Sequence, residues 1–342
     1  MIVPSFIQTH TVLSRHASVL KYGLHILRTK RLYARKPGSR DEQIKEQDRF
    51  SHMSISQLDK EFDLFNDTVT RMVDLGFAPG NWLLYAQKRL SEVHSVEPHK
   101  LNTICTVVGF DILFCQAPKG TYSIQGNIYS QNAHSNILDL LKKRTYILEE
   151  ARKKSQLNSE SSTKDNIEAD ITRLASKVSS LTIENKLAYF DQDMDLDRYQ
   201  ADLILSDLTT AFLQRDGFFN NTMAKPFIRS RENELLRQPL VNPHEAHLDL
   251  ADAAMLLCCD SLAKNGTFVL RLADVRPGDQ GLGLLQRRLE KMFQSVERWR
   301  FDHVDPRLSL KEVFFICKKK LNKTYDKYDL FDVRQIQVEA KP

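Results

Sequence analysis

The sequence lacks the features that mark membrane-spanning, zinc-binding and disulfide-rich proteins. No apolar run approaches the roughly 18 residues that a membrane-spanning helix needs. The cysteines form no C-x-x-C pair and no zinc-ligand spacing. Because most of them lie in apolar runs, we expect reduced core residues and no metal site. These cysteines are Cys105, Cys115, Cys258, Cys259 and Cys317.

Acidic residues are absent from positions 1–40. This segment carries arginines and lysines among serine, threonine and apolar residues. Its leucines at positions 13, 20, 24 and 27 can share one face of a helix. An acid-free, arginine-rich, amphipathic leader is typical of a mitochondrial transit peptide. The alternative is a basic arm that stays on the protein and binds nucleic acid. We predict a transit peptide over residues 1–40, cleaved around residues 30–40, and a protein of the mitochondrial matrix.

The composition of the whole chain is that of a globular protein. Of its 342 residues, 27% are charged and 42% are hydrophobic. This length suits one large α/β domain with appendages, or two small domains. The net charge of +5 permits a polyanionic partner but does not require one.

Strand-like apolar runs alternate with helical patterns along the chain. We predict strands at 70–75, 104–111, 121–128, 201–207, 267–272, 295–301 and 312–318. We predict helices at 54–65, 81–90, 136–154, 168–188, 245–263 and 281–293. The alternation is typical of a Rossmann-like, doubly wound α/β sheet that is mostly parallel. Residues 130–197 interrupt it with a polar helical insert, in which residues 155–167 are expected to form a flexible linker.

The most informative motif is VDLGFAPGNW, at residues 73–82. It has the pattern of a strand, a glycine-rich turn and the start of a helix. Gly76 and Gly80 permit a sharp turn, and Pro79 stiffens it. A helix that begins near Asn81 presents backbone N–H groups to a ligand above the strand end. Without G-x-G-x-x-G, a nicotinamide site is not favoured, and a turn that merely connects two core elements is the alternative.

Acids lie at or near the ends of three predicted strands, at Asp74, Asp111 and Asp207. In an open α/β sheet, ligands bind outside the carboxyl ends of the strands. Asp111 is therefore placed to accept hydrogen bonds from a ribose diol. A single strand-ending acid more often caps the following helix. The ordered set, together with the glycine turn, favours a nucleoside-bearing cofactor.

Five segments follow one another along the chain: VDLGFAPGNW (73–82), GFDILFCQAPKGTYSIQGNI (109–128), ADLILSDLTTAFLQRDGFFNN (201–221), GTFVLRL (266–272) and KEVFFICKKK (311–320). In this order they resemble the FtsJ (RrmJ) family of S-adenosylmethionine-dependent RNA 2′-O-methyltransferases, and most of all its fungal mitochondrial branch. The resemblance covers about residues 49–320 apart from the insert. It implies a methyltransferase domain of residues 49–129 and 198–320, with a terminal antiparallel strand, and a tail at 321–342.

The resemblance also implies the ligands and the site. The cofactor would be S-adenosylmethionine, and the partner would be mitochondrial large-subunit rRNA or the pre-ribosomal large subunit. The methionine end would be lined by Gly76, Ala78, Pro79, Gly80, Asn81 and Trp82. Asp111 would hold the ribose, and Asn127 would meet the adenine where many family members have Asp. Asp207 would both border the cofactor and act in catalysis, together with Arg271 and Glu312.

Two positions depart from the family's Lys-Asp-Lys-Glu tetrad, because Ser54 and Arg271 replace its lysines. The second lysine is thought to take up the 2′-hydroxyl proton or to activate that oxygen. A guanidinium stays protonated, so it cannot act as a general base. One hypothesis is an enzyme, expected to be a monomer, in which Asp207 accepts the proton. The other is a non-catalytic FtsJ-fold RNA-binding or mitoribosome-assembly factor. Candidate phosphate contacts are Lys60, Arg71, Lys225, Arg229, Arg231 and Arg237.

Overall fold

The computed structural model describes residues 40–157, 171–172, 198–208, 213–214, 228–229, 246–272, 275, 280–301, 312–321 and 327–331. The chain forms two compact units, Met1–Met53 and Ser54–Pro342. The strands belong to the second unit. The predicted transit peptide lies outside the described residues except at Arg40.

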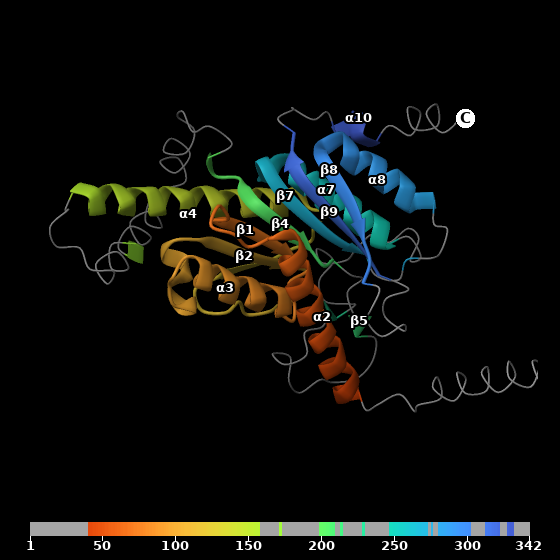
Figure 1. Cartoon of the computed structure of the whole chain (residues 1–342), viewed down its shortest axis with the longest axis horizontal. Helices are drawn as coiled ribbons and strands as arrows, with labels where there is room; N and C mark the ends of the chain where they lie inside the picture. Colours follow the sequence, from red (N-terminus) through yellow and green to blue (C-terminus); the bar gives the residue numbers. More distant parts are fainter. Residues whose placement is uncertain are drawn as a thin grey trace, which may run out of the picture. The chain divides into compact units, whose positions relative to one another are not determined.

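A seven-stranded sheet with the order β3-β2-β1-β4-β7-β9-β8 is the frame of the second unit (Figure 1). Its strands are β1 (Arg71–Leu75), β2 (Thr106–Asp111), β3 (Tyr122–Gln125), β4 (Ala201–Ser206), β7 (Leu262–Leu272), β8 (Phe293–Trp299) and β9 (Val313–Lys320). Strands β3, β2, β1, β4 and β7 pair in parallel, whereas β9 is antiparallel to both β7 and β8. The predicted Rossmann-like sheet with an antiparallel final strand is therefore confirmed. Two short strands, β5 (Leu213–Gln214) and β6 (Ile228–Arg229), pair separately.

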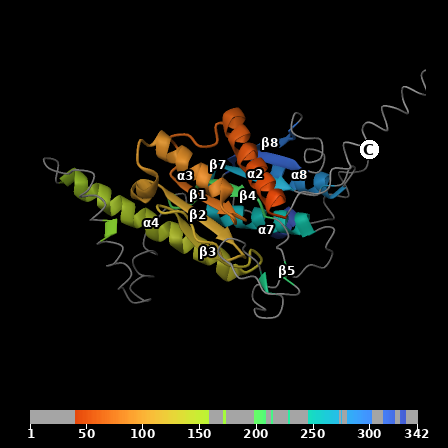
Figure 2. The same ribbon diagram turned by 90° about the horizontal axis from the view of Figure 1, so that it is seen from below.

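Helices cover both faces of the sheet (Figures 1 and 2). They are α3 (Asn81–Val93), α4 (Gln131–Leu157), α7 (Ala246–Ser261), α8 (Gln280–Met292), the short α10 (Lys327–Phe331), a 3₁₀ helix η1 (Pro98–Thr103) and the part of α2 (Arg40–Phe62) that belongs to the second unit. One buried core joins α3 and the last turns of α2 to the sheet. The other core joins α4, α7 and α8 to the opposite face. None of the helices that the structure describes is long and apolar enough to cross a membrane.

The predicted elements recur with shifted boundaries. β7 begins five residues earlier than its predicted start at 267. The strand can continue through this stretch because its register against β4 shifts between Ala201 and Leu203. The helix predicted at 136–154 is the longer α4, so residues 155–157 of the predicted linker are helical. The rest of that linker lies outside the described residues, as does the helix predicted at 168–188 apart from residues 171–172.

The crossover helix α4 packs onto the sheet through its first turns. Ala133, Ile137 and Leu141 are buried in the same core as α7 and α8. A parallel connection from β3 to β4 requires such a crossover. The core of the sheet thus includes residues that the sequence analysis assigns to the insert at 130–197. Cys105, Cys258 and Cys317 are buried and all five cysteines are free, as predicted.

Candidate active site

The strand order reverses between β1 and β4, and this reversal creates the ligand crevice of a doubly wound sheet. The acids expected there lie at this edge: Asp74 in β1, Asp111 at the end of β2 and Asp207 directly after β4. Backbone hydrogen bonds join the three segments. The Gly76 N–H donates to the Phe110 carbonyl over 2.8 Å, and the Asp207 N–H donates to the Leu75 carbonyl over 2.8 Å. The sheet thus brings the glycine turn beside Asp111 and Asp207.

Gly76 is required where the turn approaches the Asp207 segment. Its φ of +82° lies in the left-handed region. A Cβ at this position would lie 2.7 Å from the Asp207 carbonyl oxygen and 2.8 Å from the Leu208 nitrogen. Gly80 has a φ of +117°, but a Cβ there would meet no atom within 4 Å. Gly80 is the N-cap residue of α3 and makes no side-chain cap hydrogen bond, and backbone N–H groups at such a helix start can bind an anionic group.

Asp111 holds the glycine turn in place. Its Oδ2 accepts the Ala78 N–H over 3.0 Å, and its Oδ1 accepts the Leu113 N–H over 2.8 Å. Burial raises the pKa of Asp111 to about 6, although these backbone hydrogen bonds oppose the shift. Any ribose hydroxyl would therefore use the remaining lone pairs of a carboxylate that already fixes the turn. This second role could not be read from the position of Asp111 in the sequence.

Asn127 lies beside the Asp111 strand end, because the Gly126 N–H donates to the Asp111 carbonyl over 2.9 Å. Its side-chain oxygen accepts the Tyr129 N–H over 3.1 Å. Its carbonyl accepts the Ser130 N–H over 2.9 Å, one residue before α4. Asn127 thus shapes the turn into α4. Its contact with an adenine stays a prediction.

Trp82 is buried and its ring faces the core. It stacks on Phe314 of β9, with ring centroids 6.5 Å apart and planes 22° apart. This contact fixes the first turn of α3 against the sheet. That Trp82 lines the methionine end of a ligand stays a prediction. Pro79 follows a cis peptide bond, and its carbonyl accepts the Cys115 thiol at 3.7 Å.

Arg271 bridges the two predicted catalytic carboxylates. Its Nη1 donates to Asp207 Oδ1, and its Nη2 donates to Glu312 Oε1 over 2.5 Å. The three side chains come from β7, from the end of β4 and from the residue before β9. The side chains of Arg271, Asp207 and Glu312 are 16%, 17% and 19% exposed, respectively. The group is therefore mostly buried but still accessible to solvent. Ser54, which stands where the family has its first lysine, is half-buried in α2.

The electrostatics of this group keep Arg271 charged. Burial lowers the pKa of Arg271, but Asp207 and Glu312 outweigh that effect and leave the pKa raised. Burial raises the pKa of Asp207, and Arg271 opposes the shift. A permanently protonated guanidinium can orient and neutralise, but it cannot take up a proton. Asp207 is the member of the pair that can exchange a proton.

Comparison with known proteins identifies the family. Residues 54–320 match the model of the FtsJ-like methyltransferases. The chain belongs to this family. A Saccharomyces cerevisiae protein named rRNA methyltransferase 2, mitochondrial, is 29% identical over 298 residues, which span 81% of this chain and 82% of that protein. A Schizosaccharomyces pombe protein named as a candidate ribosomal RNA methyltransferase is 25% identical over 226 residues, 64% of this chain and 62% of that protein.

Among solved structures, a Plasmodium falciparum protein described as a candidate ribosomal RNA methyltransferase is similar with a TM-score of 0.43 and 16% identity. The match covers 80% of this chain and 98% of that one. The fold of this FtsJ-like methyltransferase is therefore assigned from its own strand order and pairing.

Asp74 belongs to the set of strand-end acids that the sequence offers, but the sequence gives it no role of its own in this FtsJ-like methyltransferase. Its side chain is fully buried, and neither carboxyl oxygen has a hydrogen-bond partner among the described residues. Burial raises the pKa of Asp74 well above its ordinary value, and Asp207 and Asp111 add to the shift. The surroundings of Asp74 thus disfavour its charged form, and a nearby positive charge would favour that form. The sequence shows this acid within the VDLG motif. Its burial without a hydrogen-bond partner among the described residues follows only from the packing of the sheet.

Proposed function

We propose that this chain transfers the methyl group of S-adenosylmethionine to a ribose 2′-hydroxyl of mitochondrial large-subunit rRNA. Membership of the FtsJ-like family supports the reaction class. The Saccharomyces cerevisiae relative, by its name, supports rRNA as the substrate and the mitochondrion as the location. The observation that carries the proposal is the bridge from Arg271 to Asp207 and Glu312 at the ligand-binding edge of the sheet.

The residues at this edge fit the proposed cofactor. Asp74 has no hydrogen-bond partner among the described residues, which suits a ligand that carries positive charge, and the open space beside Gly80 admits such a ligand to the start of α3. The cofactor would lie along residues 76–82, Asp111, Asn127 and Asp207. When bound, S-adenosylmethionine supplies an electrophilic methyl group on a sulfonium. Asp111 would accept a ribose hydroxyl while it keeps the turn closed.

In the proposed mechanism the protein positions the substrate and accepts its proton. Arg271 binds Oδ1 of Asp207, and we assign the uptake of the 2′-hydroxyl proton to Oδ2. Burial makes this carboxylate a stronger base than an ordinary one, because it raises the pKa of Asp207. Glu312 holds the other end of the guanidinium, so that Arg271 keeps one orientation. Holding the attacking oxygen at near-attack distance contributes several kcal/mol in favourable cases, roughly up to 7–11.

We also propose the remaining organisation of the protein. A transit peptide at residues 1–40 directs a monomer to the mitochondrial matrix, and residues 321–342 form a tail. The methyltransferase domain comprises 49–129 and 198–320. Because the first turns of α4 pack in its core, we propose that the functional insert of 130–197 begins beyond Leu141.

The rival function is a non-catalytic assembly factor that kept the fold, and the replaced lysines are the observation that favours it. Two measurements separate the alternatives. Calorimetric titration with S-adenosylmethionine measures whether the protein binds the cofactor. Mapping of 2′-O-methyl groups on mitochondrial rRNA, in cells with and without the gene, asks whether a methyl group depends on the protein. A gene-dependent methyl group supports the enzyme; cofactor binding with no such group supports the assembly factor.

A further inference from the structure

A pocket lies at the amino edge of the sheet, opposite the edge that carries the candidate active site. It has a volume of about 280 Å³ and lies between α4 and the starts of β1 and β4. β1 runs from Arg71 at the pocket to Leu75 at the active-site edge. At roughly 3.3 Å per residue, the two sites are about 13 Å apart along that strand. A ligand here would not touch the catalytic carboxylates.

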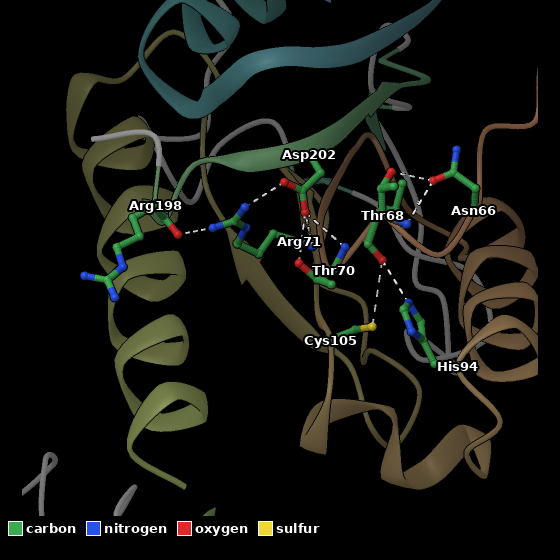
Figure 3. A network of polar contacts seen from close by, with 9 residues as sticks. Asn66, Thr68, Thr70, Arg71, His94, Cys105, Arg198 and Asp202 are labelled. Atoms are coloured by element: carbon green, nitrogen blue, oxygen red, sulfur yellow. Dashed lines mark hydrogen bonds and ion pairs between the residues drawn. The ribbon is translucent and has the colours of Figure 1, made fainter. Parts of the chain in front are cut away.

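Asp202 fixes one wall of this pocket (Figure 3). Its Oδ2 accepts the backbone N–H groups of Thr70 and Arg71 over 3.0 and 2.9 Å, and its Oδ1 accepts Arg71 Nη2 over 2.7 Å. Arg71 Nη1 donates to the Arg198 carbonyl. The guanidinium of Arg71 is therefore held rigidly at the start of β1. Arg71 is also one of the candidate phosphate contacts that the sequence offers.

Two buried polar atoms of the lining residues have no hydrogen-bond partner among the described residues. They are Arg71 Nε and Thr145 Oγ1, and Thr145 is only 8% exposed. A buried donor or hydroxyl without a partner is costly and rare in folded proteins. The ion pair between Arg71 and Asp202 holds the starts of β1 and β4 together at this edge of the sheet. It provides no hydrogen-bond partner for the hydroxyl of Thr145, which belongs to the α4 wall of the pocket.

Two further arginines add positive charge at the mouth. Arg152 is exposed and forms no ion pair within the described part of the chain, and Arg198 is 56% exposed. Arg198 pairs with Glu149 over 3.2 Å, but an ion pair this exposed contributes little and can be exchanged. Three arginines line the pocket, and two acids, Asp202 and Glu149, pair with them, so the pocket carries an excess of one positive charge. The arginines are Arg71, Arg152 and Arg198. Arginine forks suit the oxygens of a phosphate group.

We propose that this pocket binds a phosphate group, carried either by a free nucleotide or by the backbone of an RNA strand. Arg152 and Arg198 would bind the phosphate oxygens, and Thr145 would donate its hydroxyl from the α4 wall. Ligand pockets usually have volumes of about 300 Å³ or more, and the volume of this pocket, about 280 Å³, lies near that lower end. A pocket of this volume limits the bound group to about one nucleotide. The proposal does not depend on methyl transfer, because the pocket is on the other edge of the sheet.

The test measures binding to the full chain without cofactor. The probes are inorganic phosphate, adenosine monophosphate and a short single-stranded RNA, each titrated by calorimetry. Arg152→Gln and Arg198→Gln should each weaken binding about tenfold, which corresponds to about 1.4 kcal/mol. Lys153→Gln is the matched control, because Lys153 is exposed on α4 next to Arg152 but does not line the pocket. It should change the dissociation constant by less than about twofold.

Thr145→Val supplies an independent readout, because it removes the hydroxyl and keeps the shape. Since that hydroxyl has no hydrogen-bond partner among the described residues, the variant should unfold at the same temperature as the parent, or at a higher one. It should nevertheless lose most of the stabilisation that phosphate gives to the parent. Variant-sensitive binding of phosphate or the mononucleotide identifies a free ligand, whereas variant-sensitive binding of RNA alone identifies a phosphodiester. No binding of any probe, or equal losses in Arg152→Gln and Lys153→Gln, would overturn the proposal.

Discussion

Replacing Arg271 should expose how much the two active-site carboxylates depend on it. Arg271→Met keeps the length of the side chain but removes both of its hydrogen bonds to Asp207 and Glu312. Removing one partner of a buried ion pair costs about 3–5 kcal/mol. Since these groups are 16–19% exposed, we expect a loss near the lower end, about 3 kcal/mol. Arg271→Lys keeps the charge and should cost about 1 kcal/mol.

Urea unfolding near neutral pH measures these losses, with Arg298→Met as the control. Arg298 is exposed on β8, so its replacement should change the free energy of unfolding by about 0.5 kcal/mol or less. The deficit of Arg271→Met should shrink as the pH falls, because burial raises the pKa of Asp207 and protonation of that carboxylate removes an unpaired charge. Arg271→Lys should also keep or raise methyl transfer, since a lysine can lose its proton when buried. If Arg271→Met costs no more than Arg298→Met, the bridge does not stabilise the site and the reasoning is wrong.

Other predictions test the cofactor turn, the cofactor affinity and the leader. Gly76→Ala should cost about 3 kcal/mol and Gly80→Ala about 1–2, because only the first places a Cβ against the Asp207 backbone; equal losses in thermal unfolding would contradict this. Affinity for S-adenosylmethionine should fall as the pH drops through about 6, where Asp111 becomes protonated. In Asp111→Asn the affinity measured by calorimetry should be lower and independent of pH over that range; an unchanged pH profile would remove Asp111 from the site. Residues 1–40 should carry a fluorescent passenger into mitochondria, and a cytosolic passenger would support the basic-arm alternative.

The sequence predicts the fold well where local patterns decide it. Apolar runs that end in acids identify β1, β2 and β4, and the glycine turn identifies the edge of the sheet where a ligand belongs. Short-range signals cannot show which long-range pairs form. The bridge from Arg271 to Glu312 depends on the register of β7 against β9, in which Arg271 lies opposite Phe314.

Burial and distant contacts explain the features that sequence reasoning missed. Asp74 looks like any acid near a strand end until the packed sheet buries it with no hydrogen-bond partner for its carboxyl group among the described residues. One wall of the amino-edge pocket depends on the contact between Arg71 and Asp202, which are 131 positions apart in the chain. The stacking of Trp82 on Phe314 of β9 is likewise a contact between distant segments that the glycine-turn motif could not reveal.

Transfer of labelled methyl groups in vitro tests the central claim most directly. The substrate is mitochondrial large-subunit rRNA, free or in the pre-ribosomal particle, from cells that lack the gene. The parent protein and Asp207→Ala are compared after both are shown to be folded, and 2′-O-methyl positions are then mapped. We predict that the parent with S-adenosylmethionine adds a 2′-O-methyl group that Asp207→Ala does not add. Full methylation by Asp207→Ala, or none by the parent on either substrate, would contradict the proposed enzyme.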